Sequence, residues 1–329
     1  MLTSKTNSIR ALWGSAFILA RSGAKHGHSF FLMQDRLLNY LCDPNDGGAL
    51  ELHAFSTHLG QTRDGVLRNP DTGRWYVIQD GIPTLFADAL RPDDSEFVQR
   101  YESKLRELGC EFKQAESKDG DFARIESERH ARDEQAQDYD AMWSLKALAF
   151  FENPVYRKAM SVNIDSPLLE AGCGTGRLTG IFAEIAPEVV AVDMSRESIV
   201  RNRARHFART HHPVHFVHAD LTHMPIQSGK FGRCAHAGVY EHIPSRELRL
   251  KFLEHANRVL TEKGTLMLSA YRYGGLTKIW EKEGEHDGGI PFFRFTEAEL
   301  RDEVSQYFRI DEFRENLAIY MSMVVAHPI

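Results

Sequence analysis

The pattern of apolar and polar positions is most regular in the second half of the chain. From residue 167 onward, short apolar runs alternate with segments of helical periodicity. The strands expected from this pattern are residues 168–171, 189–193, 214–220, 233–239 and 265–270, and the helices are 177–185, 195–209 and 248–260. Such alternation predicts an α/β fold with a parallel sheet covered by helices on both faces. Ligands of these sheets bind beyond the carboxyl ends of the strands.

The last part of the chain departs from this alternation. Thr296, with Glu299 three residues later, forms a capping-box signature that opens a helix. Two strand-like runs follow at 307–313 and 318–326, with only a few residues between them. We expect them to form an antiparallel pair that closes the sheet, which gives a Rossmann-like sheet of seven strands.

The first half of the chain is less periodic. Turn-forming residues cluster at 43–48 and 69–73, with short β-prone runs between and after them. The stretch that follows is dense in both signs of charge and predicts exposed helices. We therefore expect four segments: a leader (1–33), a small β-rich module (34–90), a charged helical linker (91–138) and the α/β domain (139–329).

Composition and charge narrow the functional class. The formal net charge of −6 argues against a protein that mainly coats nucleic acid, because neutralising phosphates requires a basic surface. The scattered cysteines have no metal-ligand spacing and are expected to be reduced thiols, as in a cytoplasmic protein. They are Cys42, Cys110, Cys173 and Cys234.

The start of the chain bears weakly on localisation. Residues 11–20 are apolar and follow Lys5 and Arg10, a faint signal-peptide pattern, but Arg21 interrupts it and no clean cleavage site follows. A terminal helix or a mobile leader is the favoured interpretation. No run approaches membrane-spanning length, so we expect no membrane association.

Glycines gather immediately after the first predicted parallel strand, in the segment EAGCGTG at 170–176. Glycine allows the backbone to turn sharply and to approach a ligand closely. The alternative is the dinucleotide fingerprint GxGxxG, but Arg177 stands where its third glycine is needed for close helix–strand packing. A nicotinamide-dependent enzyme is therefore disfavoured.

This segment resembles motif I of the class I S-adenosylmethionine-dependent methyltransferases of the methyltransferase-11/25 type, an acidic residue followed by GxGxG. Asp193 matches that family's ribose-binding acid, and Asp220 matches the acid that binds the adenine amino group. The resemblance covers roughly residues 139–329 and implies S-adenosylmethionine as cofactor. The cofactor-binding residues that it implies are Glu170, Gly172, Cys173, Gly174, Gly176, Asp193, Met194, Asp220 and Leu221.

The segment after the fourth strand resembles the family's EH segment beside the active site. Its His242 is the candidate general base, because the ordinary pKa of histidine suits neutral pH; a structural histidine is the alternative. Tyr139 and Trp143 are candidates for substrate binding, because they could lie over the sulfonium or the acceptor, but core packing is the favoured interpretation. Residues 271–295 are expected to form a substrate loop. Further candidates for substrate binding are Tyr240, Arg272, Tyr273 and Arg294.

The β-rich module has a resemblance of its own. The segment YVIQDGIPTL at 76–85 resembles the YxIxDGIPxL signature of the zinc-ribbon-like activator domain that partners tRNA and release-factor methyltransferases. Of the paired cysteines of that family, only Cys42 is present, and Asn45 stands where a second is expected. Because a structural zinc needs four nitrogen or sulfur ligands, we expect no metal. The module is expected to be a scaffold fused in cis.

The function expected from the sequence is methyl transfer from S-adenosylmethionine to a small molecule, at oxygen, nitrogen or carbon. An RNA or protein methyltransferase is the alternative, suggested by the activator-like module. It is weakened by the acidity of the chain and by the missing Asn-Pro-Pro-Tyr-type motif. A non-enzymatic protein that binds the cofactor or a partner is a third reading. The sequence leaves the oligomeric state open.

Overall fold

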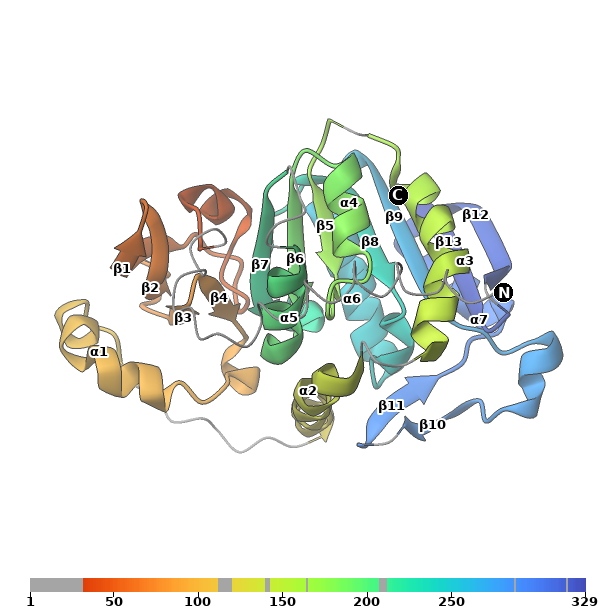
Figure 1. The fold of residues 1–329 in the computed structure, drawn as a ribbon, viewed down its shortest axis with the longest axis horizontal. Coiled ribbons are helices and arrows are strands. Elements are labelled where there is room, and N and C mark those ends of the chain that lie inside the picture. The colour runs from red at the N-terminus through yellow and green to blue at the C-terminus, as the bar shows by residue number, and fades with distance from the viewer. Residues whose placement is uncertain are drawn as a thin grey trace, which may run out of the picture. The chain divides into compact units, whose positions relative to one another are not determined.

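An eleven-stranded sheet lies at the centre of the structure, a computed structural model (Figure 1). Its strand order is β1-β2-β3-β4-β7-β6-β5-β8-β9-β13-β12. The structure describes residues 32–111, 120–139, 143–163, 165–206, 212–286, 288–317 and 319–329, without the side chains of 138, 139 and 143–149. Most of the predicted leader therefore lies outside the described residues.

The bounds of the elements are as follows. The strands of the sheet are β1 (Glu51–His58), β2 (Gln61–Arg68), β3 (Trp75–Gln79), β4 (Ile82–Leu85), β5 (Leu168–Ala171), β6 (Val189–Asp193), β7 (Val214–Ala219), β8 (Phe231–Ala237), β9 (Leu260–Tyr271), β12 (Phe308–Leu317) and β13 (Met321–Pro328). The α-helices are α1 (Ser95–Glu107), α2 (Gly120–Tyr139), α3 (Trp143–Met160), α4 (Thr179–Ile185), α5 (Arg196–His206), α6 (Arg246–Val259) and α7 (Glu297–Val304).

The predicted seven-stranded sheet is present as the run β7-β6-β5-β8-β9-β13-β12. Strands β5 to β9 are parallel to one another, whereas β13 is antiparallel to both β9 and β12. The fold class and the antiparallel closing pair are thus confirmed, although only β13 runs against the parallel strands. The chain order reverses between β5 and β8, which is the switch point where such sheets bind ligands.

Alternate residues of the parallel strands enter two different hydrophobic cores. In β6, Val189 and Ala191 pack with α3, α4 and α5, whereas Val190 and Val192 pack with α6 and α7 on the opposite face. Because both faces are covered, β5 and β7 are buried along their whole length. This is why the strands appear in the sequence as continuous apolar runs.

The predicted β-rich module supplies the other four strands of the sheet. Strands β1 to β4 are antiparallel to one another, and β4 then pairs in parallel with β7, with Thr84 opposite His218 and Leu85 opposite Ala219. Figure 1 shows this continuation of the sheet beside β7. The segment that carries the DGIP signature therefore lies at the junction with the α/β part.

Arginines strengthen this junction by donating to carbonyl oxygens of the module. Arg196 Nη2 donates to Gln79 O at 3.0 Å, and Arg203 Nη1 donates to Asp80 O at 2.5 Å. On the neighbouring strand, Thr84 Oγ1 and His218 Nδ1 are 3.2 Å apart. The accepting atoms are backbone oxygens, which every residue has, so no sequence pattern indicates these contacts.

A buried carboxylate organises the turn where the activator-like resemblance expects metal ligands. Asp43 accepts hydrogen bonds from Tyr76 Oη at 2.6 Å, Asn69 Nδ2 at 2.9 Å and the backbone N–H of Asn45 at 2.8 Å. Cys42 is a buried free thiol. Within the described ranges, no cluster of histidine, cysteine and acidic residues is placed to hold a metal ion. Hydrogen bonds to Asp43 therefore fix the turn.

The prediction of exposed linker helices is wrong for α2. Glu128 and Arg129 are only 5% and 6% exposed, and α2 packs against α5. The charges are buried because they are paired: Arg132 forms an ion pair with Glu128, and Arg129 Nη1 donates to Leu90 O at 3.0 Å. Among the helices that the structure describes, none is long and apolar enough to cross a membrane.

Two glycines of the module give a matched test of how closely it packs. Gly81 has φ +76°, and a Cβ there would lie 2.5 Å from Leu32 Cα and 2.8 Å from Met33 N. Gly60 has the same φ, with no described atom within 4 Å of such a Cβ. We expect Gly60→Ala to reduce the free energy of unfolding by about 1 kcal/mol through backbone strain. Gly81→Ala should reduce the free energy of unfolding by roughly 2 kcal/mol more than Gly60→Ala does, because the backbone of residues 32–33 must move.

Urea denaturation followed by circular dichroism measures both costs. Equal losses in the two variants would contradict the close approach of residues 32–33 to the DGIP turn.

Candidate functional site

The loop after β5 is shaped by three glycines with positive φ: Gly172 at 85°, Gly174 at 50° and Gly176 at 92°. A Cβ on Gly172 would lie 2.5 Å from Val239 Cγ2, and one on Gly176 would collide with Asn202. At Gly174, a Cβ would meet no described atom within 4 Å. Gly172 and Gly176 are therefore needed for close packing, whereas the backbone of Gly174 is open on the side where a Cβ would lie.

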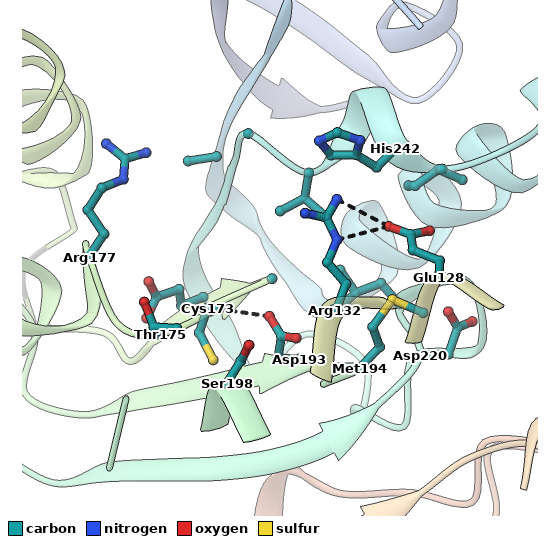
Figure 2. Close-up of a pocket in the computed structure, with 18 of the residues that line it drawn as sticks. Glu128, Arg132, Cys173, Thr175, Arg177, Asp193, Met194, Ser198, Asp220 and His242 are labelled. Carbon is teal, nitrogen blue, oxygen red and sulfur yellow. Dashed lines mark hydrogen bonds and ion pairs between the residues drawn. The ribbon is translucent and has the colours of Figure 1, made fainter. Parts of the chain in front are cut away.

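The Asp193 carboxylate at the end of β6 holds this loop. The backbone N–H of Gly174 donates to Oδ2 at 2.7 Å, and that of Ser195 donates to Oδ1 at 2.9 Å (Figure 2). Burial raises the pKa of Asp193, and the two backbone N–H groups oppose that rise. The carboxylate thus joins the loops that follow two neighbouring parallel strands.

Asp220 caps the short 3₁₀ helix η3 (Leu221–His223) that follows β7. It accepts a hydrogen bond from the backbone N–H of Thr222 at 2.9 Å and another from the Thr222 hydroxyl, and His223 Nδ1 lies 3.3 Å away. Each of these contacts is to Oδ1. The second predicted acid is thereby fixed at the same edge of the sheet as Asp193.

A pocket opens at this edge, beyond the carboxyl ends of β5, β6, β7 and β8 (Figure 2). The predicted residues that line it are Glu170, Gly172, Cys173, Gly174, Asp193, Met194, Asp220, Leu221 and His242. Gly176 does not line the pocket and acts on the course of the loop instead. The structure therefore brings the predicted cofactor residues other than Gly176 into one site.

Glu170 lies at the base of the pocket and is 4% exposed. Its Oε2 accepts a hydrogen bond from Thr179 Oγ1 at 2.6 Å, and Asn202 Nδ2 donates to the same hydroxyl at 2.8 Å. Burial raises the pKa of Glu170 to about 8. A cation bound nearby would favour the ionised carboxylate.

Helix α2 supplies lining residues that were assigned to the linker. Arg132 lies across the pocket between Asp193 and His242 and forms an ion pair with Glu128 at 3.3 Å (Figure 2). Burial raises the pKa of Glu128 to about 7. The other α2 residues in the lining are Ile125, Gln135 and Ala136. Nothing in the charge pattern distinguishes these residues from a solvated helix face.

His242 lies opposite the glycine loop, in the 3₁₀ helix η4 (Tyr240–His242). Its Nδ1 is 2.7 Å from the carbonyl oxygen of Pro291, in the hairpin of β10 (Glu283–His286) and β11 (Ile290–Phe293). Since a carbonyl oxygen only accepts, Nδ1 carries the hydrogen and Nε2 keeps its lone pair. Burial holds the pKa of His242 well below its ordinary value, so the ring is neutral at physiological pH.

The other predicted substrate residues are not part of the described pocket lining. Tyr240 is fully buried and donates to Glu303 Oε2 at 2.6 Å. Arg272 pairs with Glu315 at 3.3 Å, Arg294 stacks on Phe292, and Tyr273 lies beside Lys282. The side chains of Tyr139 and Trp143 lie outside the described residues.

The segment predicted to be a substrate loop is largely ordered into defined elements. It contains the 3₁₀ helix η5 (Gly275–Ile279) and the β10–β11 hairpin. It contacts the pocket at His242, through the Pro291 carbonyl oxygen and through the rings of Tyr271 and His286. A backbone carbonyl has no side-chain signature, so this contact could not be inferred from the sequence.

These residues fit S-adenosylmethionine. Buried carboxylates at the ends of two adjacent strands can accept hydrogen bonds from ribose hydroxyls and an adenine amino group. The open side of Gly174 and the Glu170 carboxyl suit a cationic amino-acid chain. The fit to the cofactor rests on two features of the pocket: its acidic lining residues and the glycine loop, where no side chain blocks the backbone at Gly174.

Comparisons with known proteins agree with this site. Residues 169–268 match the family model described as methyltransferase domain. Two curated relatives from Mycobacterium tuberculosis strains, both described as probable S-adenosylmethionine-dependent methyltransferases, are 30% identical over 102 residues. The match covers 31% of this chain and 34% of each relative, so it spans about a third of the relatives' length.

Solved structures show similarity at low sequence identity. The DhpI complex with S-adenosylhomocysteine is 19% identical, with a TM-score of 0.49, over 62% of this chain and 96% of that one. The CcbJ methyltransferase from Streptomyces caelestis is 16% identical, with a TM-score of 0.49, over 61% and 98%. Residues 169–268 are therefore similar in sequence to a methyltransferase domain, and the strand order around the pocket agrees with that similarity.

Proposed function

We propose that this protein transfers the methyl group of S-adenosylmethionine to a small-molecule acceptor. The observation that carries the proposal is the convergence of the glycine loop, Asp193 and Asp220 on one pocket at the switch point of the sheet. When bound there, S-adenosylmethionine supplies an electrophilic methyl group on a sulfonium. Because this group is already activated, holding the acceptor close and aligned can provide much of the rate.

Each part of the cofactor has residues of this chain to hold it. Asp193 would accept hydrogen bonds from the ribose hydroxyls, and Asp220 would accept one from the adenine amino group. Met194 and Leu221 would flank the adenine ring, since both line the pocket beside these acids. Glu170 and the bare backbone at Gly174 would face the methionine end.

The charge of the pocket supports a small acceptor over RNA. Glu170, Asp193 and Asp220 line it, and the lining Arg132 is already paired with Glu128. Arg177, which also lines the pocket, is paired with Glu152. Such a lining would repel the phosphates of a polynucleotide, which needs cations to bind. The α2 helix also contributes five lining residues and so limits access to the pocket.

His242 is the candidate group for handling a proton on the acceptor. Its Nδ1–H is held by Pro291 O, which leaves Nε2 as a hydrogen-bond acceptor and a base. Because its pKa is depressed, Nε2 is a weak base, better suited to orienting an O–H or N–H group than to storing its proton.

The proposed function is tested with S-adenosylmethionine labelled in its methyl group. The protein is incubated with an extract of its source cells fractionated by size, and the labelled products are identified by mass spectrometry. Label in small molecules, with release of S-adenosylhomocysteine, supports the proposal. Label confined to RNA or protein would instead support the macromolecular alternative, and binding without any transfer would support a non-enzymatic role.

Asp193→Asn should weaken S-adenosylhomocysteine binding about 30-fold, because hydrogen bonds to a charged acceptor contribute roughly 1.5–3 kcal/mol. Asp302→Asn is the matched control, since its side chain is 68% exposed and forms a surface ion pair with Arg246. Calorimetry measures both affinities. Equal affinities in the two variants would remove Asp193 from the cofactor site.

The affinity for S-adenosylmethionine should rise between pH 6 and 7.5. The raised pKa values of Glu128, about 7, and Glu170, about 8, mean that these carboxyls lose protons as the pH increases. The ionised forms attract the cationic cofactor, so binding also releases protons. Calorimetry in buffers of different ionisation enthalpy measures this release.

Glu170→Gln provides the control for that pH dependence. The variant should lose part of both the affinity increase and the proton release. An unchanged pH profile in this variant would show that Glu170 does not titrate on binding.

His242→Asn should reduce methyl transfer about 100-fold while leaving S-adenosylhomocysteine affinity within threefold. The asparagine Nδ2 can still donate to Pro291 O, but the Nε2 lone pair is lost. Single-turnover rates and calorimetry separate the two effects. A variant with the wild-type transfer rate would exclude a role for Nε2.

A further inference from the structure

A chain of hydrogen bonds runs from helix α6 to the predicted adenine acid, Asp220. Lys251 Nζ of α6 lies 2.6 Å from His223 Nε2, and His223 Nδ1 lies 3.3 Å from Asp220 Oδ1. The chain passes through η3 and ends at the edge of the sheet where the pocket opens. Lys251 and His223 are not part of the described pocket lining, so they reach a ligand there only through Asp220.

The direction of each hydrogen bond in this chain follows from the groups involved. An ammonium group only donates, so His223 Nε2 accepts from Lys251 and the ring hydrogen lies on Nδ1. That N–H is shared between Asp220 Oδ1 and Thr222 Oγ1, which lies 3.1 Å away. The backbone N–H and the hydroxyl of Thr222 also donate to Asp220 Oδ1. All the described donors to Asp220 therefore act on the same oxygen.

The other carboxylate oxygen, Asp220 Oδ2, is left for a ligand. It accepts no hydrogen bond from the described residues, and it is not among their fully buried polar atoms without a partner. A molecule in the pocket can reach it, because Asp220 lines the pocket. Since three donors hold Oδ1, the carboxylate cannot exchange its two oxygens without breaking these bonds.

The chain also places a positive charge behind the Asp220 carboxylate. Burial lowers the pKa of Lys251, and Asp220 is the acid that most opposes this shift, followed by Glu254 and Glu247. The attraction is mutual, so the Lys251 ammonium favours the ionised form of Asp220. Because Lys251 lies outside the pocket lining, this cation takes none of the space in which a ligand would bind.

The His223 ring that joins the two charges is itself held in place. Its side chain is only 14% exposed. Phe122 of α2 packs against it, with ring centroids 5.9 Å apart and an angle of 37° between the rings. Three elements, α2, η3 and α6, therefore fix the ring between Lys251 and Asp220.

We propose that Lys251 and His223 are positioning residues that make the pocket select a purine with an amino group at position 6. In the proposed function, on which this inference rests, Asp220 accepts a hydrogen bond from adenine. Lys251 and His223 keep that acceptor charged and oriented, with Oδ2 free for the amino group. A site built to accept an N–H group rejects an analogue that lacks it, because the polar atom of the site is then left unpaired.

The test compares two ligands that differ only at position 6 of the purine. One is S-adenosylhomocysteine, and the other is its analogue with hydrogen in place of the 6-amino group. The ratio of their dissociation constants, measured by calorimetry, is the 6-amino preference. We expect a preference of about 30-fold in the wild-type protein, as for one hydrogen bond to a charged acceptor.

Lys251→Met removes the charge and the donor while keeping a long side chain. His223→Phe removes both bonds of the ring while keeping its packing against Phe122. Each variant should reduce the 6-amino preference to about fivefold, as for a hydrogen bond without charge assistance. Lys251→Arg restores a charged donor to His223 Nε2 and should stay within twofold of the wild-type preference.

Two further variants provide the controls. Lys230→Met, at an exposed lysine without a described ion pair, should keep the wild-type preference. Asp220→Asn removes the charged acceptor itself and should also lower the preference to about fivefold or less. Thermal midpoints of all the variants check that each protein is folded.

The outcomes separate the positioning role from a structural one and from the proposed function. Variants of Lys251 and His223 that weaken both ligands equally, or neither, would keep the wild-type preference and overturn the positioning role. A wild-type protein without a preference, or an Asp220→Asn variant that keeps it, would remove Asp220 from the adenine and overturn the role as well. Failure of the wild-type protein to bind S-adenosylhomocysteine would instead overturn the proposed function.

Discussion

The site depends on the bonds that Asp193 accepts from the backbone N–H groups of Gly174 and Ser195. They fix the glycine loop after β5 against the turn after β6, and so determine the shape of the pocket. The carboxylate can serve in this way because β5 and β6 are adjacent and parallel, with Ala171 opposite Val192. The parallel sheet thus brings residues 19 positions apart into direct contact.

The same edge of the sheet connects the amino-terminal module to the candidate cofactor site. Thr84 of β4 contacts His218 of β7, and His218 Nε2 lies 3.0 Å from the carbonyl oxygen of Met194. Burial lowers the pKa of His218 to about 3, so the ring is neutral and bridges the two groups through its two nitrogens. The module therefore supports the backbone beside the predicted adenine site. Within the module, hydrogen bonds to Asp43 fix the turn at which the activator-like family has metal ligands.

The parallel sheet, and the position of Asp193 at its edge, were predictable because they depend on local sequence. Continuous apolar runs such as 189–192 indicate strands buried on both faces, and Asp193 directly follows one of them. The features that were not predicted depend on tertiary contacts. The charge pattern of α2 is that of a solvated helix, and only the structure shows that Arg132 and Glu128 pair with each other at the pocket. Tyr240 was expected at the substrate site, but its ring lies in the core, where Glu303 accepts a hydrogen bond from its hydroxyl.

A crystal structure of the protein grown with S-adenosylhomocysteine tests the central claim most directly. The claim is that the carboxyl ends of β5, β6 and β7 hold an adenosyl group. We expect the ribose hydroxyls within hydrogen-bond distance of Asp193, the adenine beside Asp220 and Leu221, and the homocysteine chain along Gly174. A nucleoside bound elsewhere, or a pocket that stays empty at saturating ligand, would contradict the claim.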